Sequence, residues 1–144
     1  MLEVTVAAAI VFILISMVLA NCKTRVDKAN LEKTVNEMMA IAQASLDYYN
    51  SRGNWPVTPS DLAPTYMNAA VTSSPFGGNY QINNVNNMVT VSTSVPSGLA
   101  KNYYQGTILE ITPGAGQDTI EISQQLPNQF AGRLEYEKKY RYLQ

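Results

Sequence analysis

The residues that most often carry enzyme chemistry are scarce in this sequence. Its 144 residues include no histidine and one cysteine, Cys22. Without histidine the chain cannot build a Ser-His-Asp or Cys-His catalytic set, and one cysteine cannot form an internal disulfide or a cysteine metal cluster. The sequence also contains no glycine-rich phosphate loop followed by lysine and no Gly-x-Ser-x-Gly nucleophile turn. We therefore expect no enzyme activity, no bound metal and no cofactor.

A few carboxylates remain to be explained. Asp118 and Glu121 flank a strand-like segment and could bind Ca²⁺ together with loop carbonyls, but a solvated sheet edge explains them better. Asp61 lies in a Pro-Ser-Asp-Leu turn, where a capping role is more natural than that of a catalytic base. Glu3 is different, because it is the only charge before Lys23 and stands at the start of an apolar run. It either accompanies a helix N-terminus, which favours a carboxylate, or needs a cation such as the α-amino group of a neighbouring subunit.

The overall charge excludes one class of partner. The ten basic side chains are matched by eleven acidic ones, giving a formal charge of −1. A phosphate-binding surface needs a basic excess, so we predict no direct nucleic-acid site.

The N-terminal end is strongly apolar. Every residue from Val4 to Ala20 is apolar except Thr5 and Ser16. A helix of this length spans about 25 Å, or about 30 Å counted from Met1, which is just enough to cross a bilayer. Since the run is apolar on all sides, it must lie in lipid or be surrounded by protein.

Three interpretations of this run compete. A cleaved secretory signal would open with positive charge, which is absent here, and a lipoprotein variant would carry its lipid on Cys22. A plain membrane anchor would be followed by basic residues on the cytoplasmic side, where Lys23, Arg25 and Lys28 stand. The third interpretation is a helix that starts in the membrane and later packs against copies of itself.

The helix is expected to continue well past the apolar run. No proline or glycine occurs before Gly53, and opposite charges stand four residues apart at Lys28–Glu32 and Lys33–Glu37. Small or apolar residues recur in steps of four and three at Leu31, Val35, Met38, Ala42, Ser45 and Tyr49. The pattern predicts one helix from about Leu2 to Asn50, about 75 Å long, with an apolar first half and an amphipathic second half.

The remaining residues predict a small β-rich head. A hairpin is expected from Thr107–Ile111 and Thr119–Ser123 around a Pro-Gly-Ala-Gly turn. Further strands are expected at Tyr80–Ile82 and Val89–Thr93, separated by an Asn-rich turn at Asn83–Asn87. A short helix is expected within Pro96–Gln105, with Leu99, Tyr103 and Tyr104 facing inward.

The C-terminal run from Arg133 to Gln144 carries two patterns. Its apolar residues alternate as on a strand, whereas Glu135–Lys139 has helical spacing; we favour a strand, with Leu134, Tyr136, Tyr140 and Tyr142 on one face. The expected fold class is α+β, a long N-terminal α-helix packed on a small antiparallel β-sheet head. We divide the chain into an N-terminal helix, 1–52, and a globular head, 53–144, with the helix apolar over 1–21 and amphipathic over 22–52.

The N-terminal pattern Met1-Leu2-Glu3-Val4-Thr5-Val6-Ala7-Ala8-Ala9-Ile10, followed by a long apolar helix, resembles the start of type IV pilins and of the related type II secretion pseudopilins. The segment Trp55–Leu62 is similar to the stretch that follows the long helix in that family, and Ser74–Tyr80 to its Pro-aromatic-Gly loop. The likeness is specific over residues 1–30, looser as far as Tyr80, and only architectural beyond it.

The resemblance implies a structural subunit of an extracellular helical filament that supports adhesion, motility, DNA uptake or secretion. Such a subunit resides in the inner membrane before assembly and is polymerised by a pilus assembly machinery. Its leader is removed, and the new N-terminus is methylated. Glu3 would pair with the N-terminal amine of a neighbouring copy. Subunit assembly would then rest on Glu3, Met1, Val4, Val6, Ile10, Ile13, Leu14 and Val18.

Three features depart from the family pattern. The family glutamate usually stands fifth in the mature chain and here stands third, so either two residues precede Met1 or the spacing differs. Many relatives have a proline near the end of the apolar run, where this chain has Leu19, Ala20 and Asn21. Many also close a C-terminal loop with a disulfide, which one cysteine cannot form. The main alternative is a membrane-anchored or lipid-anchored extracytoplasmic binding domain that does not polymerise.

Overall fold

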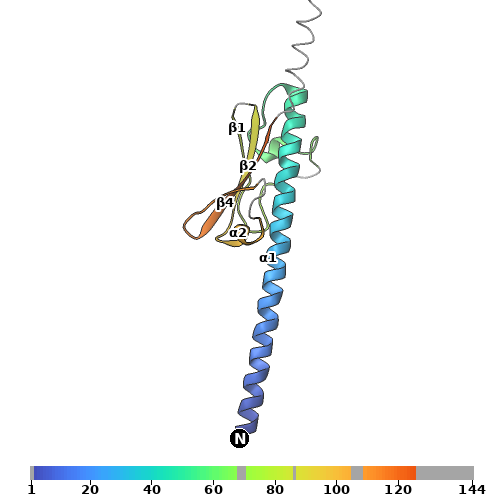
Figure 1. Ribbon diagram of the computed structural model, residues 1–144. Coiled ribbons are helices and arrows are strands. Elements are labelled where there is room, and N and C mark those ends of the chain that lie inside the picture. Colours follow the sequence, from blue (N-terminus) through green and yellow to red (C-terminus); the bar gives the residue numbers. More distant parts are fainter. Residues whose placement is uncertain (1, 68–70, 86, 105–108, 126–144) are drawn as a thin grey trace, which may run out of the picture.

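The computed structural model describes residues 2–67, 71–85, 87–104 and 109–125, with side chains described from Ile10 onward. One long helix, α1 (Leu2–Arg52), runs the length of the molecule, and the sheet lies against its C-terminal half (Figure 1). The helix ends at Gly53, whose φ of 74° is left-handed and whose N–H donates to the carbonyl of Tyr49 at 2.8 Å. Glycine reverses the chain there without strain, so the predicted helix and its end are confirmed.

The sheet has four antiparallel strands in the order β1-β2-β4-β3. Their bounds are β1 (Gln81–Val85), β2 (Met88–Pro96), β3 (Leu109–Thr112) and β4 (Gln117–Gln125). The two nine-residue strands, β2 and β4, pair along their whole length in the centre. A short 3₁₀ turn, η1 (Pro59–Leu62), follows α1. A short helix, α2 (Leu99–Tyr103), lies between β2 and β3 in the chain. The α+β prediction is confirmed.

The core lies between α1 and the inner face of β2 and β4. Alternation along the strands turns apolar side chains toward the helix, as expected for a sheet with one covered face: Val89, Val91, Val95, Ile120 and Ile122 are buried. The helix contributes most of the predicted stripe, with Leu31, Val35, Met38, Ala42 and Ser45 buried and Tyr49 only half-buried, and it adds the buried side chains of Ile41 and Leu46. The amphipathic half of α1 therefore completes the core of the head.

Two local predictions differ in part from the structure. The turn expected at Asn83–Asn87 is shorter, because β1 continues to Val85, which pairs with Met88, while Asn87 adopts the left-handed backbone (φ 62°) that asparagine tolerates. In and after α2, Leu99 and Tyr104 pack against the core as predicted, but the fully buried residue is Ala100 and Tyr103 is 37% exposed. Because pairing with β4 extends β2 to Pro96, α2 begins only at Leu99. The later start changes which face of α2 lies against the core. The predicted C-terminal strand lies outside the described residues.

Candidate functional site

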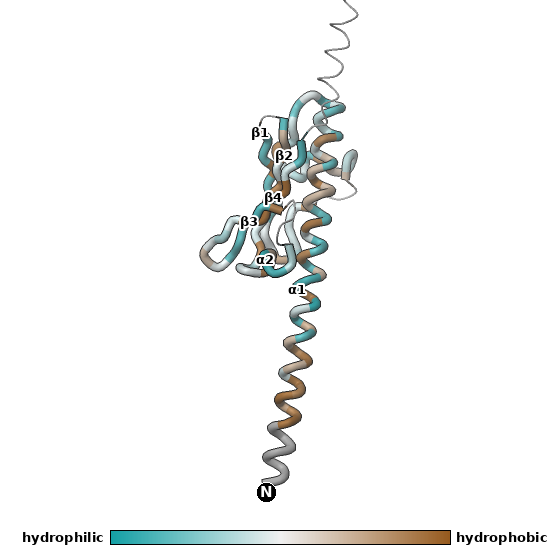
Figure 2. The backbone as a smooth tube through the Cα atoms, viewed as in Figure 1, coloured by the Kyte–Doolittle hydropathy of each residue, from teal (hydrophilic) through white to brown (hydrophobic). Residues whose placement is uncertain are grey.

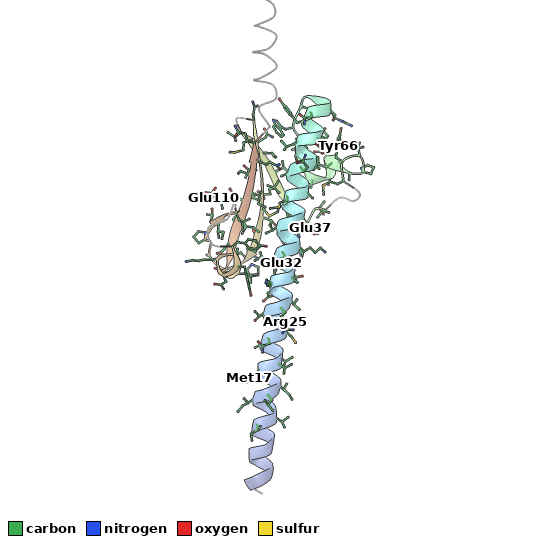
Figure 3. All side chains as sticks on the ribbon, turned by 45° about the vertical axis from the view of Figure 1, so that its right-hand side comes forward. Met17, Arg25, Glu32, Glu37, Tyr66 and Glu110 are labelled. Carbon is green, nitrogen blue, oxygen red and sulfur yellow. The ribbon has the colours of Figure 1, made fainter. Side chains whose placement is uncertain are left out.

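The feature that stands apart from the folded head is the N-terminal part of α1. In Figure 1 the helix continues far below the sheet, and Figure 2 colours this part mostly as hydrophobic where side chains are described. Every side chain from Ile10 to Val26 is exposed. Figure 3 shows Met17 and Arg25 on this free part of the helix, and Glu37 level with the sheet. We call Ile10–Val26 the stem.

The stem is apolar around its whole circumference as far as Leu19. Four of the predicted assembly residues share one face and are 53–61% exposed: Ile10, Ile13, Leu14 and Val18. The assembly prediction left out Met17 on the same face and the equally exposed side chains of the other faces, Val11, Phe12, Ile15 and Leu19. Their signal was already in the sequence, since a run without a polar face predicts burial on every side.

The two hydroxyl groups on the stem are turned back onto the helix. The Ser16 hydroxyl donates to the carbonyl of Phe12 at 2.8 Å, and the Thr24 hydroxyl donates to the carbonyl of Ala20 at 3.0 Å. Each hydroxyl is satisfied within one turn, so neither requires water or a partner side chain.

The remaining predicted assembly residues stay predictions. Glu3, Val4 and Val6 lie in the helix, but their side chains are outside the described part, as is the whole of Met1. Among the described residues, no helix carries a stretch long and apolar enough to cross a membrane.

Cys22 and its neighbours mark the upper part of the stem. From the sequence alone a lone cysteine is expected to be a small buried residue, and for Cys22 this expectation is wrong. Cys22 is exposed, because the packed part of α1 begins only at Leu31. The predicted ion pair of Lys28 with Glu32 is present, with 3.8 Å between the ammonium nitrogen and the nearer carboxylate oxygen. It is a solvent-exposed pair and contributes little to stability.

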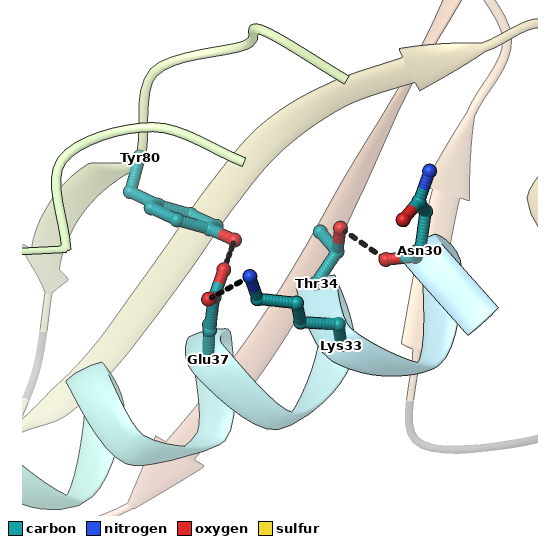
Figure 4. Close-up of polar contacts among 5 residues, drawn as sticks. All are labelled: Asn30, Lys33, Thr34, Glu37 and Tyr80. Atoms are coloured by element: carbon teal, nitrogen blue, oxygen red, sulfur yellow. Dashed lines mark hydrogen bonds and ion pairs between the residues drawn. The ribbon is translucent and has the colours of Figure 1, made fainter. Parts of the chain in front are cut away.

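The head is fixed to α1 by a polar contact next to the core. The Tyr80 hydroxyl donates to a Glu37 carboxylate oxygen at 2.6 Å, and Lys33 lies 3.8 Å from the other oxygen of that carboxylate (Figure 4). Tyr80 is buried, and burial together with the adjacent carboxylate raises the pKa of its hydroxyl well above the usual value. This contact sets how the segment before β1 is held against the helix.

The Asp118 carboxylate links two loops of the head by hydrogen bonds. Its carboxylate accepts hydrogen bonds from the Gly98 N–H at 2.7 Å, the Ser97 hydroxyl at 3.0 Å and the Gly114 N–H at 3.5 Å. These donors, the Gly98 amide first, lower the pKa of Asp118. The carboxylate thus joins the loop before α2 to the β3–β4 turn.

The sequence offered two interpretations of Asp118 and Glu121, a Ca²⁺ site and a solvated sheet edge. Neither holds for Asp118. Strand alternation places Asp118 on the buried face of β4 and Glu121 on the outer face. Asp118 is 4% exposed, so it is not a solvated edge residue either. Among the described residues, no group of three His, Cys, Asp or Glu side chains is placed to hold a metal ion.

Asp61 acts as a cap, as predicted. Its carboxylate accepts the N–H of Thr58 at 2.8 Å and that of Val57 at 3.0 Å, and these bonds lower its pKa, with Thr58 contributing most. The aromatic residues near the end of α1 pack on one another: Tyr49 stacks on Trp55 with 4.4 Å between ring centroids, and Tyr48 meets Tyr66 edge-on.

The architecture is that of an elongated molecule in which a long helix carries a small sheet at one end. Compared with solved structures, the chain is similar to the major type IV pilin PilA1 from Clostridium difficile, with a TM-score of 0.50 and 17% sequence identity. The match covers 69% of this chain and 97% of that one. No protein-family model matches the sequence, and no curated protein matches it. The chain thus has a type IV pilin-like fold.

Proposed function

We propose that this chain is the structural subunit of an extracellular type IV pilus-like filament and that copies polymerise through the stem. The observation that carries the proposal is the exposure of the stem's apolar side chains on every face. Burying one such side chain stabilises by about 1.5–3 kcal/mol, so a bare stem is unfavourable in water. Packing against the stems of other copies removes all faces from water together. The pilin-like fold supports this role.

The same stem would lie in the inner membrane before assembly. In this proposal residues 1–52 form the helix that moves from lipid into the filament, and residues 53–144 form the head on its surface. The assembly machinery would remove a leader and methylate the new N-terminus, after which the filament would be exported to the bacterial cell surface. Such a filament could serve adhesion, motility, DNA uptake or secretion.

Glu3 is the residue whose role is easiest to test. Once the N-terminal ends of the helices pack together, an unpaired Glu3 carboxylate in the low-dielectric interior between them is strongly unfavourable. Pairing with the N-terminal amine of a neighbouring copy removes that penalty. Val4, Val6 and the apolar residues that follow them would supply the surrounding contacts, so that Glu3 fixes the register between copies.

The experiment compares Glu3→Gln and Glu3→Ala with a matched control, Glu32→Gln, which removes an exposed carboxylate farther along the same helix. We expect both Glu3 variants to remain in the membrane fraction and to lose most or all filaments, while Glu32→Gln assembles normally. Filaments are counted by negative-stain microscopy of material sheared from cells. Normal yields from both Glu3 variants contradict the proposed role.

A second candidate is a membrane-anchored or lipid-anchored extracytoplasmic binding domain that does not polymerise. It is favoured by one observation, the clear division between the stem and a head packed from Leu31 onward. This candidate predicts that the full chain never forms fibres and that removal of residues 1–21 leaves a soluble monomer. The microscopy described above decides between the two, because only the filament subunit yields fibres.

A further inference from the structure

Two cations stand just beyond the apolar part of the stem. Lys23 and Arg25 are the first charged side chains after Ala20, and both are exposed. Within the described ranges, the ion pairs lie farther along the helix, at Lys28–Glu32 and Lys33–Glu37. No carboxylate in that part of the chain therefore forms an ion pair with Lys23 or Arg25, and the two positive charges are available to a partner.

The helix places these cations at the depth of a bilayer's headgroup layer when the apolar run lies in the hydrocarbon. At about 1.5 Å per residue, Lys23 lies about 4.5 Å and Arg25 about 7.5 Å beyond Ala20 along the helix axis. A headgroup layer is about 5–7 Å thick on each side of the hydrocarbon core. Helical side chains tilt toward the N-terminus, so these long side chains reach back toward the apolar run and the layer that borders it.

The two cations lie on opposite sides of the helix. They are two residues apart, which is about 200° around the helix axis. One partner helix would cover only one of them, whereas headgroups surround a membrane helix on all sides, as the apolar side chains below also require. In the part of the chain that the structure describes, the head leaves this zone uncovered, because the first buried residue is Leu31, about 9 Å beyond Arg25. Figure 3 shows Arg25 on the helix below the sheet.

We propose that Lys23 and Arg25 bind the phosphate groups of anionic phospholipids at the bilayer surface before the chain assembles. This inference rests on the membrane stage of the proposed function. A basic side chain beside an anionic bilayer favours an anionic headgroup over a neutral one by about fivefold. The bound cations fix the depth of the helix in the bilayer and hold the head clear of the surface.

The test measures which phospholipid gathers around the stem. A donor dye is attached to Cys22, the only cysteine of the chain and an exposed one. The full chain is reconstituted into phosphatidylcholine vesicles that contain a minor share of phosphatidylglycerol, and flotation after alkaline extraction establishes that it is inserted. Energy transfer is then compared for two tracers at equal trace amounts, phosphatidylglycerol and phosphatidylcholine, each with the acceptor dye on its acyl chain.

Transfer to the phosphatidylglycerol tracer should correspond to a local enrichment of about fivefold over the phosphatidylcholine tracer. Raising the salt from about 0.1 M to about 1 M shortens the Debye length from about 10 Å to about 3 Å and should remove most of this preference. Lys23→Gln with Arg25→Gln should make the two tracers equal, because glutamine keeps the helix and removes the charge.

Two further variants serve as controls. Lys33→Gln with Lys101→Gln removes the same charge from exposed positions level with or within the head, and it should keep the preference for phosphatidylglycerol. Lys23→Arg with Arg25→Lys keeps both charges in place and should keep the preference as well.

Three results overturn the inference. Equal transfer to the two tracers in an inserted parent chain overturns it alone and leaves the proposed function standing. A preference that persists in Lys23→Gln with Arg25→Gln assigns the anionic lipid to another part of the chain. A parent chain that does not float with the vesicles removes the membrane stage itself and, with it, this inference.

Discussion

Val18 offers the sharpest test of the stem as an assembly surface. It is 61% exposed, in the apolar part of α1. Val18→Ala removes two methyl groups, each worth about 0.8 kcal/mol when buried. Scaled by the exposed fraction, 61%, complete burial in a filament gives a loss of about 1 kcal/mol per subunit. This raises the subunit concentration needed for assembly about fivefold.

The chain supplies a matched control for this substitution. Val57→Ala makes the same chemical change at a position that is 77% exposed, in the loop that follows α1. Because alanine is a better helix former than valine, Val18→Ala does not weaken the stem helix. An assembly defect confined to Val18→Ala therefore reports on lost burial between copies.

The assay is the ratio of sheared, pelleted filaments to membrane-bound subunit at equal expression, supported by the concentration at which the purified chain polymerises. Val18→Ala should lower the ratio, and Val57→Ala should match the parent chain. Equal ratios for the two variants would refute the reasoning, because they would show that Val18 stays as exposed in the filament as in the single subunit.

Three further predictions concern the head, each read from urea unfolding followed by Trp55 fluorescence. Tyr80→Phe should lower the free energy of unfolding by about 1–2 kcal/mol, since the Glu37 carboxylate loses a donor. Because the folded-state pKa of Tyr80 is raised, the parent chain should lose stability as pH rises above about 10 more steeply than Tyr80→Phe does, and equal slopes would contradict this. The pKa of Asp118 is lowered instead, so its carboxylate stabilises the fold above pH about 4, and this stabilisation is lost as pH falls through the folded-state pKa. Asp118→Asn should therefore be less stable than the parent chain at pH 7 and should lose less stability on acidification. An acid unfolding profile identical to that of the parent would contradict the contact. Gly78→Ala would place a Cβ 2.7 Å from the Ser94 carbonyl oxygen and should destabilise by about 1–3 kcal/mol, so parental stability would count against this close approach.

Local periodicity made the helix predictable. The steps of four and three from Leu31 to Tyr49 define a face whatever packs on it, and Gly53 ends the helix through its own backbone freedom. The hairpin of β3 and β4 was predictable for the same reason, since a Pro-Gly-rich turn separates two alternating segments. The apolar surface of the stem could also be anticipated, because it depends only on the consecutive residues of one helix.

Contacts between distant residues were not predictable in this way. Asp118 was interpreted from its neighbour Glu121, yet its role is set by Gly98 and Ser97, which meet it only after β2 and β4 pair. Tyr80 and Glu37 are likewise far apart in sequence and joined only by packing.

The sequence by itself determined the long helix and its change from apolar to amphipathic character, because each depends on spacing within a single segment. The tertiary structure alone decided that the head covers α1 only from Leu31, which carboxylates fix the head, and how far β1 extends past its asparagines. Those features arise from strand pairing and from the packing of α1 on the sheet, and the free energy of such long-range contacts is not written in any local pattern.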